Sequence, residues 1–198
     1  MGGTPTPLPV PNPGPTAQSP GPHPGPEPGP SATGEREYPK ESLFGKDAVF
    51  AAIPWNEAVV ALGEFATDAK WDRKELTITV ARENIVPGCR AVQAGGFEFL
   101  EDLTAVDWYP QEPRMQLTYH VLSLGLKQRV RLVVRLDSAD LTVDSITGVW
   151  PSSNFYEREV FDLFGVKFSG HPGLTRIMMP PDWKGNPLRK DYPVEGYR

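Results

Sequence analysis

The sequence predicts an α+β fold: a mostly antiparallel sheet with helices packed on one side, plus an extended C-terminal segment. Two alternating apolar–polar runs, residues 115–121 and 130–136, flank a short loop that contains Gly125, a pattern typical of an antiparallel hairpin. Apolar residues at helical spacing occur elsewhere, most clearly in residues 154–164. An antiparallel hairpin combined with separate amphipathic helices indicates this architecture.

The composition divides the chain into three parts. Residues 1–34 alternate Pro with Gly, Ser and Thr, and Pro both fixes φ and lacks an amide donor. We therefore expect a disordered tail that is partly polyproline II. An α+β domain is expected over residues 35–170, and an extended, partner-binding segment over residues 171–198. The tail's PxPxP-like spacing suits an SH3- or WW-type groove, but a solvated spacer is the favoured interpretation.

Other elements are predicted from the spacing of their apolar residues. We expect a short helix over residues 55–66, a half-buried strand over 76–80, a second helix over 85–92 and an extended run over 97–108. The apolar face of the first helix consists of Trp55, Val59, Leu62 and Ala66. Cys89, on the apolar face of the second helix, is interpreted as a buried small hydrophobe.

The two faces of the hairpin differ in character. One is apolar and is expected to build the core; it consists of Met115, Leu117, Tyr119, Val121, Val130, Leu132, Val134 and Leu136. The other carries His120 and three arginines, Arg129, Arg131 and Arg135. An ordinary solvated sheet face is the favoured interpretation of this second surface, and a docking face for an acidic partner is the alternative.

Local signals define both ends of the helix over residues 154–164. Asn154 is a favoured N-cap residue, and Glu157 is placed to reach back to it in a capping-box-like arrangement. Gly165 stands where a left-handed C-terminal cap is needed. The core-facing stripe consists of Tyr156, Val160, Leu163 and Phe164.

Three carboxylates on this helix, Glu157, Glu159 and Asp162, are the densest acidic group on a predicted helix. Paired carboxylates serve acid–base catalysis or bind metals. However, Glu157 and Glu159 point roughly 200° apart around an α-helix, so they cannot converge on one substrate atom. Asp162 is expected to pair with Arg158, one turn earlier, on the exposed side. Structural roles are therefore favoured.

His171 lies in a Ser-Gly-His-Pro turn after a strand-like run over residues 166–168. The remaining histidines, His23 and His120, give no spacing that resembles a zinc site. A hydrogen bond to the backbone or to a neighbouring subunit is the favoured role.

The sequence also has no phosphate-binding loop, nucleophile elbow or dinucleotide fingerprint. We expect no catalytic, cofactor-binding or metal-ligating residue on this chain.

Composition excludes further classes. The single cysteine among 198 residues rules out an intramolecular disulfide and a cluster that needs about four thiolates. The net charge of −5 gives no reason to expect nucleic-acid binding. No run approaches the roughly 18 apolar residues of a membrane span, and the N-terminus lacks the pattern of a secretory signal.

A Pro-bounded run near the C-terminus is a candidate binding motif. It combines two cations, an acid and an aromatic ring, and consists of Leu188, Arg189, Lys190, Asp191, Tyr192 and Pro193. Arg and Tyr are enriched at the centres of protein interfaces. A partner-binding role is weighed against an ordinary basic loop.

Several of these stretches resemble one known family. Residues 157–165 (EREVFDLFG), followed by residues 168–172 (FSGHP), resemble the signature of the thirty-kilodalton (C) subunit of proton-pumping NADH:quinone oxidoreductase, respiratory complex I. Residues 99–110, 115–136 and 185–193 (GNPLRKDYP) fit the same family. The resemblance is specific from about Glu98 to the C-terminus, loose before it and absent in the tail.

The resemblance implies a cofactor-free scaffold of the peripheral arm. Such a subunit packs against the forty-nine-kilodalton (D) subunit and neighbouring arm subunits, while FMN, iron–sulfur clusters and quinone are bound elsewhere in the complex. Its membrane association is indirect, at the cytoplasmic face of a bacterial inner membrane. The implied interface or family-motif residues are Glu157, Arg158, Glu159, Asp162, Gly165, Gly170, His171, Pro172, Arg176, Leu188, Arg189, Lys190, Asp191, Tyr192 and Pro193.

Two other hypotheses stay open at this point. One is the homologous subunit of a membrane-bound hydrogenase or ferredoxin-linked complex, which a single chain cannot distinguish from the first. The other is a free-standing enzyme that uses His171 and the acidic helix.

Overall fold

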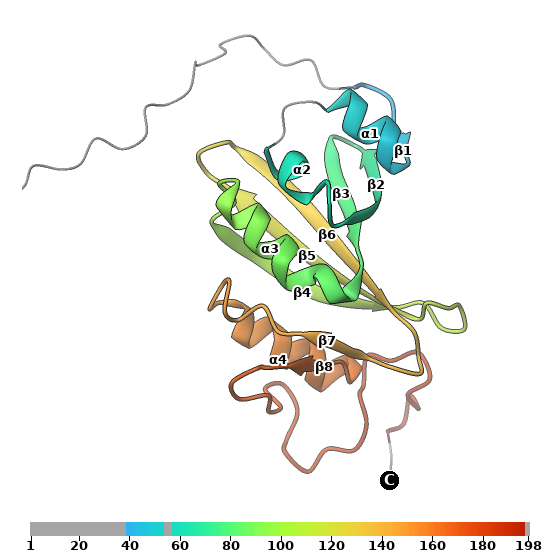
Figure 1. Cartoon of the computed structure of the whole chain (residues 1–198). Coiled ribbons are helices and arrows are strands. Elements are labelled where there is room, and N and C mark those ends of the chain that lie inside the picture. The colour runs from blue at the N-terminus through green and yellow to red at the C-terminus, as the bar shows by residue number, and fades with distance from the viewer. Residues whose placement is uncertain (1–38, 54–56, 197–198) are drawn as a thin grey trace, which may run out of the picture. The chain divides into compact units, whose positions relative to one another are not determined.

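Six strands form the main sheet of the protein (Figure 1). In spatial order they are β1 (Leu43–Phe44), β2 (Ala66–Asp72), β3 (Glu75–Val80), β6 (Gln128–Leu136), β5 (Met115–Ser123) and β4 (Phe99–Asp107). Neighbouring strands run antiparallel except β3 and β6, which are parallel. The predicted mostly antiparallel sheet is confirmed, with this one parallel pair inside it.

The computed structural model describes residues 39–53 and 57–196. The predicted tail over residues 1–34 therefore lies outside the described residues, as does Trp55.

A second, two-stranded parallel sheet pairs β7 (Thr142–Asp144) with β8 (Lys167–Ser169). After β8, residues 170–196 form turns and bends rather than further helix or strand.

Helices contribute to the core on one side of the main sheet. They are α1 (Lys46–Ala52), α2 (Glu57–Leu62), α3 (Ile85–Ala94) and α4 (Ser153–Phe164), with a short 3₁₀ turn at Arg82–Asn84. Each helix buries apolar side chains against the sheet, for example Leu62 of α2 and Val160 of α4. Within the described residues, no helix combines the length and the apolar character that a bilayer span demands.

The hairpin is the best-predicted element. Met115 lies opposite Leu136, and Ser123 lies opposite Gln128, so the two strands pair along their whole length. The alternating apolar residues of both strands are buried, as predicted. Cys89 is also fully buried, and this burial raises the pKa of its thiol far above the ordinary value.

The predicted helix over residues 55–66 is wrong at its C-terminal end. The α2 helix stops at Leu62, because the chain turns through Gly63 and Phe65, whose N–H groups bond back to Val60 and Leu62. Ala66 instead begins β2, where pairing with β3 satisfies its backbone. The side chain of Val59 is outside the described set.

Candidate protein-interaction site

Residues 171–196, called here the C-terminal segment, return along α4 and the end of the main sheet (Figure 1). Two networks of buried charge hold the C-terminal segment to the domain. One is built on α4 and the other on the loop between β4 and β5.

The first network centres on Asp162, which is fully buried. Its Oδ2 accepts hydrogen bonds from the backbone N–H groups of residues 177, 178 and 179, at 3.0, 2.8 and 2.8 Å. Its Oδ1 accepts a bond from the Arg176 guanidinium. Burial alone would raise the pKa of Asp162, but the bonds from Met179, Arg176 and their neighbours outweigh burial and lower it.

Arg158 does not pair with Asp162, so the predicted exposed ion pair is wrong. Arg158 donates instead to the carbonyl oxygens of Thr175 and Arg176, both at 3.1 Å. Arg176 in turn donates to the Gly185 carbonyl at 3.1 Å. Asp162 and Arg158, one turn apart on α4, therefore both bind the C-terminal segment. The carboxylate accepts from backbone N–H groups of the segment, and the guanidinium donates to its backbone C=O groups.

Glu157 does not form the predicted capping box. The helix begins at Ser153 with no side-chain cap, and Glu157 is fully buried. Its carboxylate accepts bonds from the Ser145 hydroxyl at 2.6 Å and the Ile146 N–H at 2.8 Å. Burial raises the pKa of this group despite those bonds. Glu157 thus ties α4 to the loop after β7, while Glu159 is exposed.

His171 bonds to backbone on both sides of its ring, as predicted. Its Nε2 lies 3.2 Å from the Asn154 carbonyl oxygen, and its Nδ1 accepts the Gly173 N–H at 3.0 Å. This arrangement requires the proton on Nε2. Gly170, with φ of 78°, makes the turn before it, and Pro172 follows. The ring therefore joins the start of the C-terminal segment to the start of α4.

Gly165 ends α4 in the left-handed conformation that was predicted, with φ of 80° and ψ of 19°. The C-terminal segment completes this cap. Asn186 donates to the Asp162 carbonyl at 3.0 Å, and the Leu188 N–H donates to the Leu163 carbonyl at 3.1 Å. Carbonyl groups that a helix end leaves without intrahelical partners are satisfied here by distant residues.

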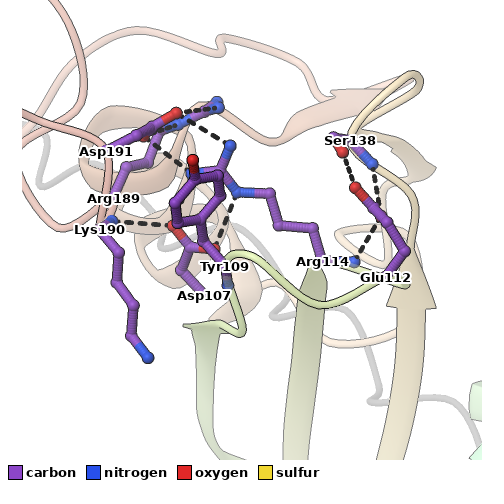
Figure 2. Close-up of polar contacts among 8 residues, drawn as sticks. All are labelled: Asp107, Tyr109, Glu112, Arg114, Ser138, Arg189, Lys190 and Asp191. Carbon is purple, nitrogen blue, oxygen red and sulfur yellow. Dashed lines mark hydrogen bonds and ion pairs between the residues drawn. The ribbon is translucent and has the colours of Figure 1, made fainter.

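The second network was not predicted. Arg114, just before β5, forms a two-armed ion pair with Asp107 at the end of β4, with both contacts at 2.8 Å (Figure 2). The same guanidinium reaches Asp191 at 2.9 and 2.8 Å. The Tyr109 ring stacks with its centroid 4.8 Å from the guanidinium carbon. Seventy-seven positions separate Arg114 from Asp191, and no local pattern in the sequence signals the pairing.

The carboxylate of Asp107 also binds the backbone of the candidate motif over residues 188–193. Asp107 accepts the N–H groups of Lys190 at 2.8 Å and Tyr109 at 3.0 Å. The Arg114 guanidinium lowers the pKa of Asp107 to about 2, and Arg114 with Arg189 holds the pKa of Asp191 far below its ordinary value. In Figure 2 the Lys190 side chain extends away from the carboxylates, so its backbone alone takes part.

Several large hydrophobic side chains of this region are exposed to solvent, among exposed charged residues. Large hydrophobic side chains with exposed fractions between 39 and 62 % gather on the C-terminal segment, on α4 and on the β4–β5 loop; they are Trp108, Tyr109, Phe155, Ile177, Met178, Trp183 and Leu188. The C-terminal segment therefore binds the domain through its backbone and through polar side chains such as Arg176 and Asp191, and it leaves these apolar side chains exposed. Exposed apolar groups collected in one region mark protein-interaction sites.

These features define a class of protein: an α+β domain whose irregular C-terminal segment is held by buried charges and carries exposed hydrophobic side chains. Within residues 39–53 and 57–196, no three His, Cys, Asp or Glu side chains are grouped to hold a metal ion. The chain belongs to the family of the 30 kDa subunit of the respiratory-chain NADH dehydrogenase, which matches residues 78–198. The resemblance inferred from the sequence motifs is confirmed.

Individual relatives agree with this family. The chain is 44 % identical over 146 residues to the C subunit of the NADH-quinone oxidoreductase of Citrifermentans bemidjiense, and 46 % identical over 147 residues to that of Geobacter sulfurreducens. Both matches cover 71 % of this chain and 91 % of the relative. A chain in the structure of the membrane-bound sulfane sulfur reductase, an archaeal respiratory membrane complex, is 26 % identical with a TM-score of 0.56, covering 68 % of this chain and 82 % of that one.

Proposed function

We propose that this chain is a C-type subunit of an NADH:quinone oxidoreductase and that it acts there as a scaffold without a redox centre. The complex passes electrons from NADH through FMN and iron–sulfur centres to quinone and couples this transfer to proton translocation. Family membership and the two relatives named as C subunits support the assignment to the complex.

The scaffold role rests on one observation. The backbone of the C-terminal segment is bound to buried charges of the domain, chiefly Asp162 and Asp107, while its large apolar side chains stay exposed. A segment fixed in this way is already ordered before it meets a partner, so binding costs little conformational entropy. Such a surface suits permanent contact with another subunit.

The proposed partner of this surface is the forty-nine-kilodalton (D) subunit, with neighbouring subunits of the peripheral arm around it. FMN, the iron–sulfur clusters and the quinone would be bound by those other chains. The site would lie at the cytoplasmic face of a bacterial inner membrane, where the chain associates with the membrane only through the complex.

A second candidate is the corresponding subunit of a related membrane-bound complex, such as a hydrogenase or a ferredoxin-linked complex. The similarity to a chain of the archaeal reductase favours it, but identity there is 26 %, against 44 and 46 % to the two NADH-quinone oxidoreductase relatives. The hypothesis of a free-standing enzyme has little support, because both ring nitrogens of His171 and the buried carboxylates of Glu157 and Asp162 are engaged in structural hydrogen bonds.

Affinity purification of the tagged chain from its native membrane tests the proposal. The expected eluate includes a D-type subunit and oxidises NADH with a quinone acceptor. The chain purified alone is expected to show no visible absorption. A stoichiometric flavin or iron–sulfur spectrum on the isolated chain would contradict the scaffold role, and nickel-site subunits in place of an NADH-oxidising subunit would favour the second candidate.

A further inference from the structure

A cavity of about 300 Å³ lies at the end of the sheet opposite the C-terminal segment. It is lined by Trp71, Lys74, Glu75, Leu76, Lys127, Gln128 and Arg129. These residues come from the β2–β3 turn, the β5–β6 loop and the adjoining ends of β2, β3 and β6, which lie together because β3 and β6 run parallel from that end. Nine-residue strands put this cavity about 30 Å from Arg114.

The lining carries excess positive charge in a chain whose net charge is −5. Its one acid, Glu75, is paired with Arg131 and lies 3.9 Å from Arg129, which also bonds Glu101 at 2.8 Å. Within the described part of the chain, Lys74 and Lys127 form no ion pair. Two exposed ammonium groups therefore remain available at the mouth of the cavity.

Both lysines stand in a strained conformation. Their φ angles are 67° and 53°, and Arg73 beside Lys74 has φ of 52°. Gly or Asn would occupy these left-handed positions at lower cost, and two-residue hairpin turns such as that of residues 73–74 normally use them. Strain of this kind often marks sites that bind a ligand. The positions keep cationic side chains at an energetic cost.

The rest of the lining indicates the kind of ligand. Trp71 and Leu76 supply apolar walls. The Oε1 atom of Gln128 is a buried acceptor without a partner among the described residues, and such groups generally require a donor. A peptide has N–H donors as well as carboxylates, whereas a simple anion has few donors to offer. The volume is at the lower limit of ligand sites and suits a side chain better than a cofactor.

We propose that this cavity binds an acidic peptide segment of a neighbouring subunit, with Lys74 and Lys127 contacting its carboxylates. This contact lies beyond the proposed function, which places the partner on the C-terminal segment. The chain would then contact neighbouring subunits at both ends of its sheet. The proposed contact through the C-terminal segment would stay unchanged.

Isothermal titration of the full chain with acetyl-tetraglutamyl amide tests this site. We expect binding that weakens with salt and that is at least tenfold tighter than for acetyl-tetraglutaminyl amide or inorganic phosphate. The variant Lys74→Gly/Lys127→Gly should lose at least tenfold in affinity while its Tm rises, because glycine relieves the left-handed strain. Loss of binding would then not reflect unfolding. Arg90→Ala/Lys167→Ala removes two exposed cations elsewhere and should keep the affinity.

Three outcomes would overturn the proposal: equal affinity for phosphate or for the neutral peptide, unchanged binding by the Lys74→Gly/Lys127→Gly variant, or tighter binding to anionic lipid vesicles than to the peptide. A Met178→Asp/Leu188→Asp variant, which alters only the surface assigned to the partner in the proposed function, should bind the peptide normally. Failure of one proposal is therefore distinguishable from failure of the other.

Discussion

Arg114 and Asp107 form a buried, two-armed ion pair, with side-chain exposures of 6 and 1 %. The pair closes the end of the main sheet, because Asp107 ends β4 and Arg114 precedes β5. Through Asp191 and the Lys190 N–H, the pair also binds the C-terminal segment. One buried contact thus joins the stability of the domain to the position of its proposed binding surface.

Replacing Arg114 with Ala should destabilise the chain strongly. The change leaves the Asp107 carboxylate buried without its partner, and such a loss costs about 3–5 kcal/mol. Urea unfolding measures the difference. Arg129→Ala is the matched control: it breaks an exposed pair with Glu101 and should cost less than about 1 kcal/mol. Similar costs for both variants would show that the buried pair has no special role.

Stability should fall as the solution becomes acidic. The pKa of Asp107 is about 2 in the folded chain and about 3.9 when unfolded. Its ionised form therefore favours folding above about pH 4, and this contribution, on the order of 2–3 kcal/mol, is lost as the pH falls toward 2. Unfolding curves at a series of pH values measure it. Asp107→Asn should be less stable at neutral pH and should show a shallower decline; an unchanged decline would exclude Asp107 as its source.

Gly165→Ala should destabilise the end of α4. The left-handed φ costs about 1–2 kcal/mol for a residue with a Cβ, and that Cβ would lie 2.7 Å from the Asn186 Oδ1. In an Asn186→Ala background, which removes the clashing side chain together with its bond to the Asp162 carbonyl, the same glycine replacement should cost only the backbone part. Gly173→Ala, where a Cβ would meet no atom within 4 Å, is the control. Thermal unfolding compares the variants, and equal Tm values for both glycine replacements would contradict this account.

Asp162→Asn should loosen the C-terminal segment more than the rest of the domain. The amide has no charge to attract Arg176 and cannot match the bonds that the carboxylate accepts from residues 177–179. We expect a loss of about 2–3 kcal/mol and faster amide exchange at those three residues. Glu159→Gln, the same chemical change on an exposed side chain of the same helix, should stay within about 0.5 kcal/mol of the native chain. Unaltered exchange in Asp162→Asn would refute the role assigned to the carboxylate.

The sequence predicted the elements whose side-chain pattern is strong. The hairpin over residues 115–136 alternates cleanly, and α4 has a clear apolar stripe and a Gly165 cap. The elements β1, α1 and β2 were missed. The β1 strand has two residues, and β2 buries Ala66, Ala69 and Trp71, of which two are small. Short strands of that kind are determined by their partners in the sheet more than by their own pattern.

The polar contacts of the site could not be predicted for a related reason. Helical periodicity says which residues share a face, and it placed Asp162 near Arg158. The actual partners of Asp162 lie 14 to 17 positions later, and those of Glu157 lie 11 to 12 positions earlier. Only the tertiary fold brings such groups together, so a local rule assigned both carboxylates to the wrong partners.

The central claim is that the apolar side of the C-terminal segment binds another subunit. The amount of D-type subunit that is recovered with a purified Met178→Asp/Leu188→Asp variant tests it most directly, since both side chains are exposed and their replacement should leave Tm unchanged. We predict that the partner is lost from this variant and retained by Val60→Asp, a control at an exposed apolar residue of α2. Full recovery of the partner with the doubly substituted chain would contradict the account.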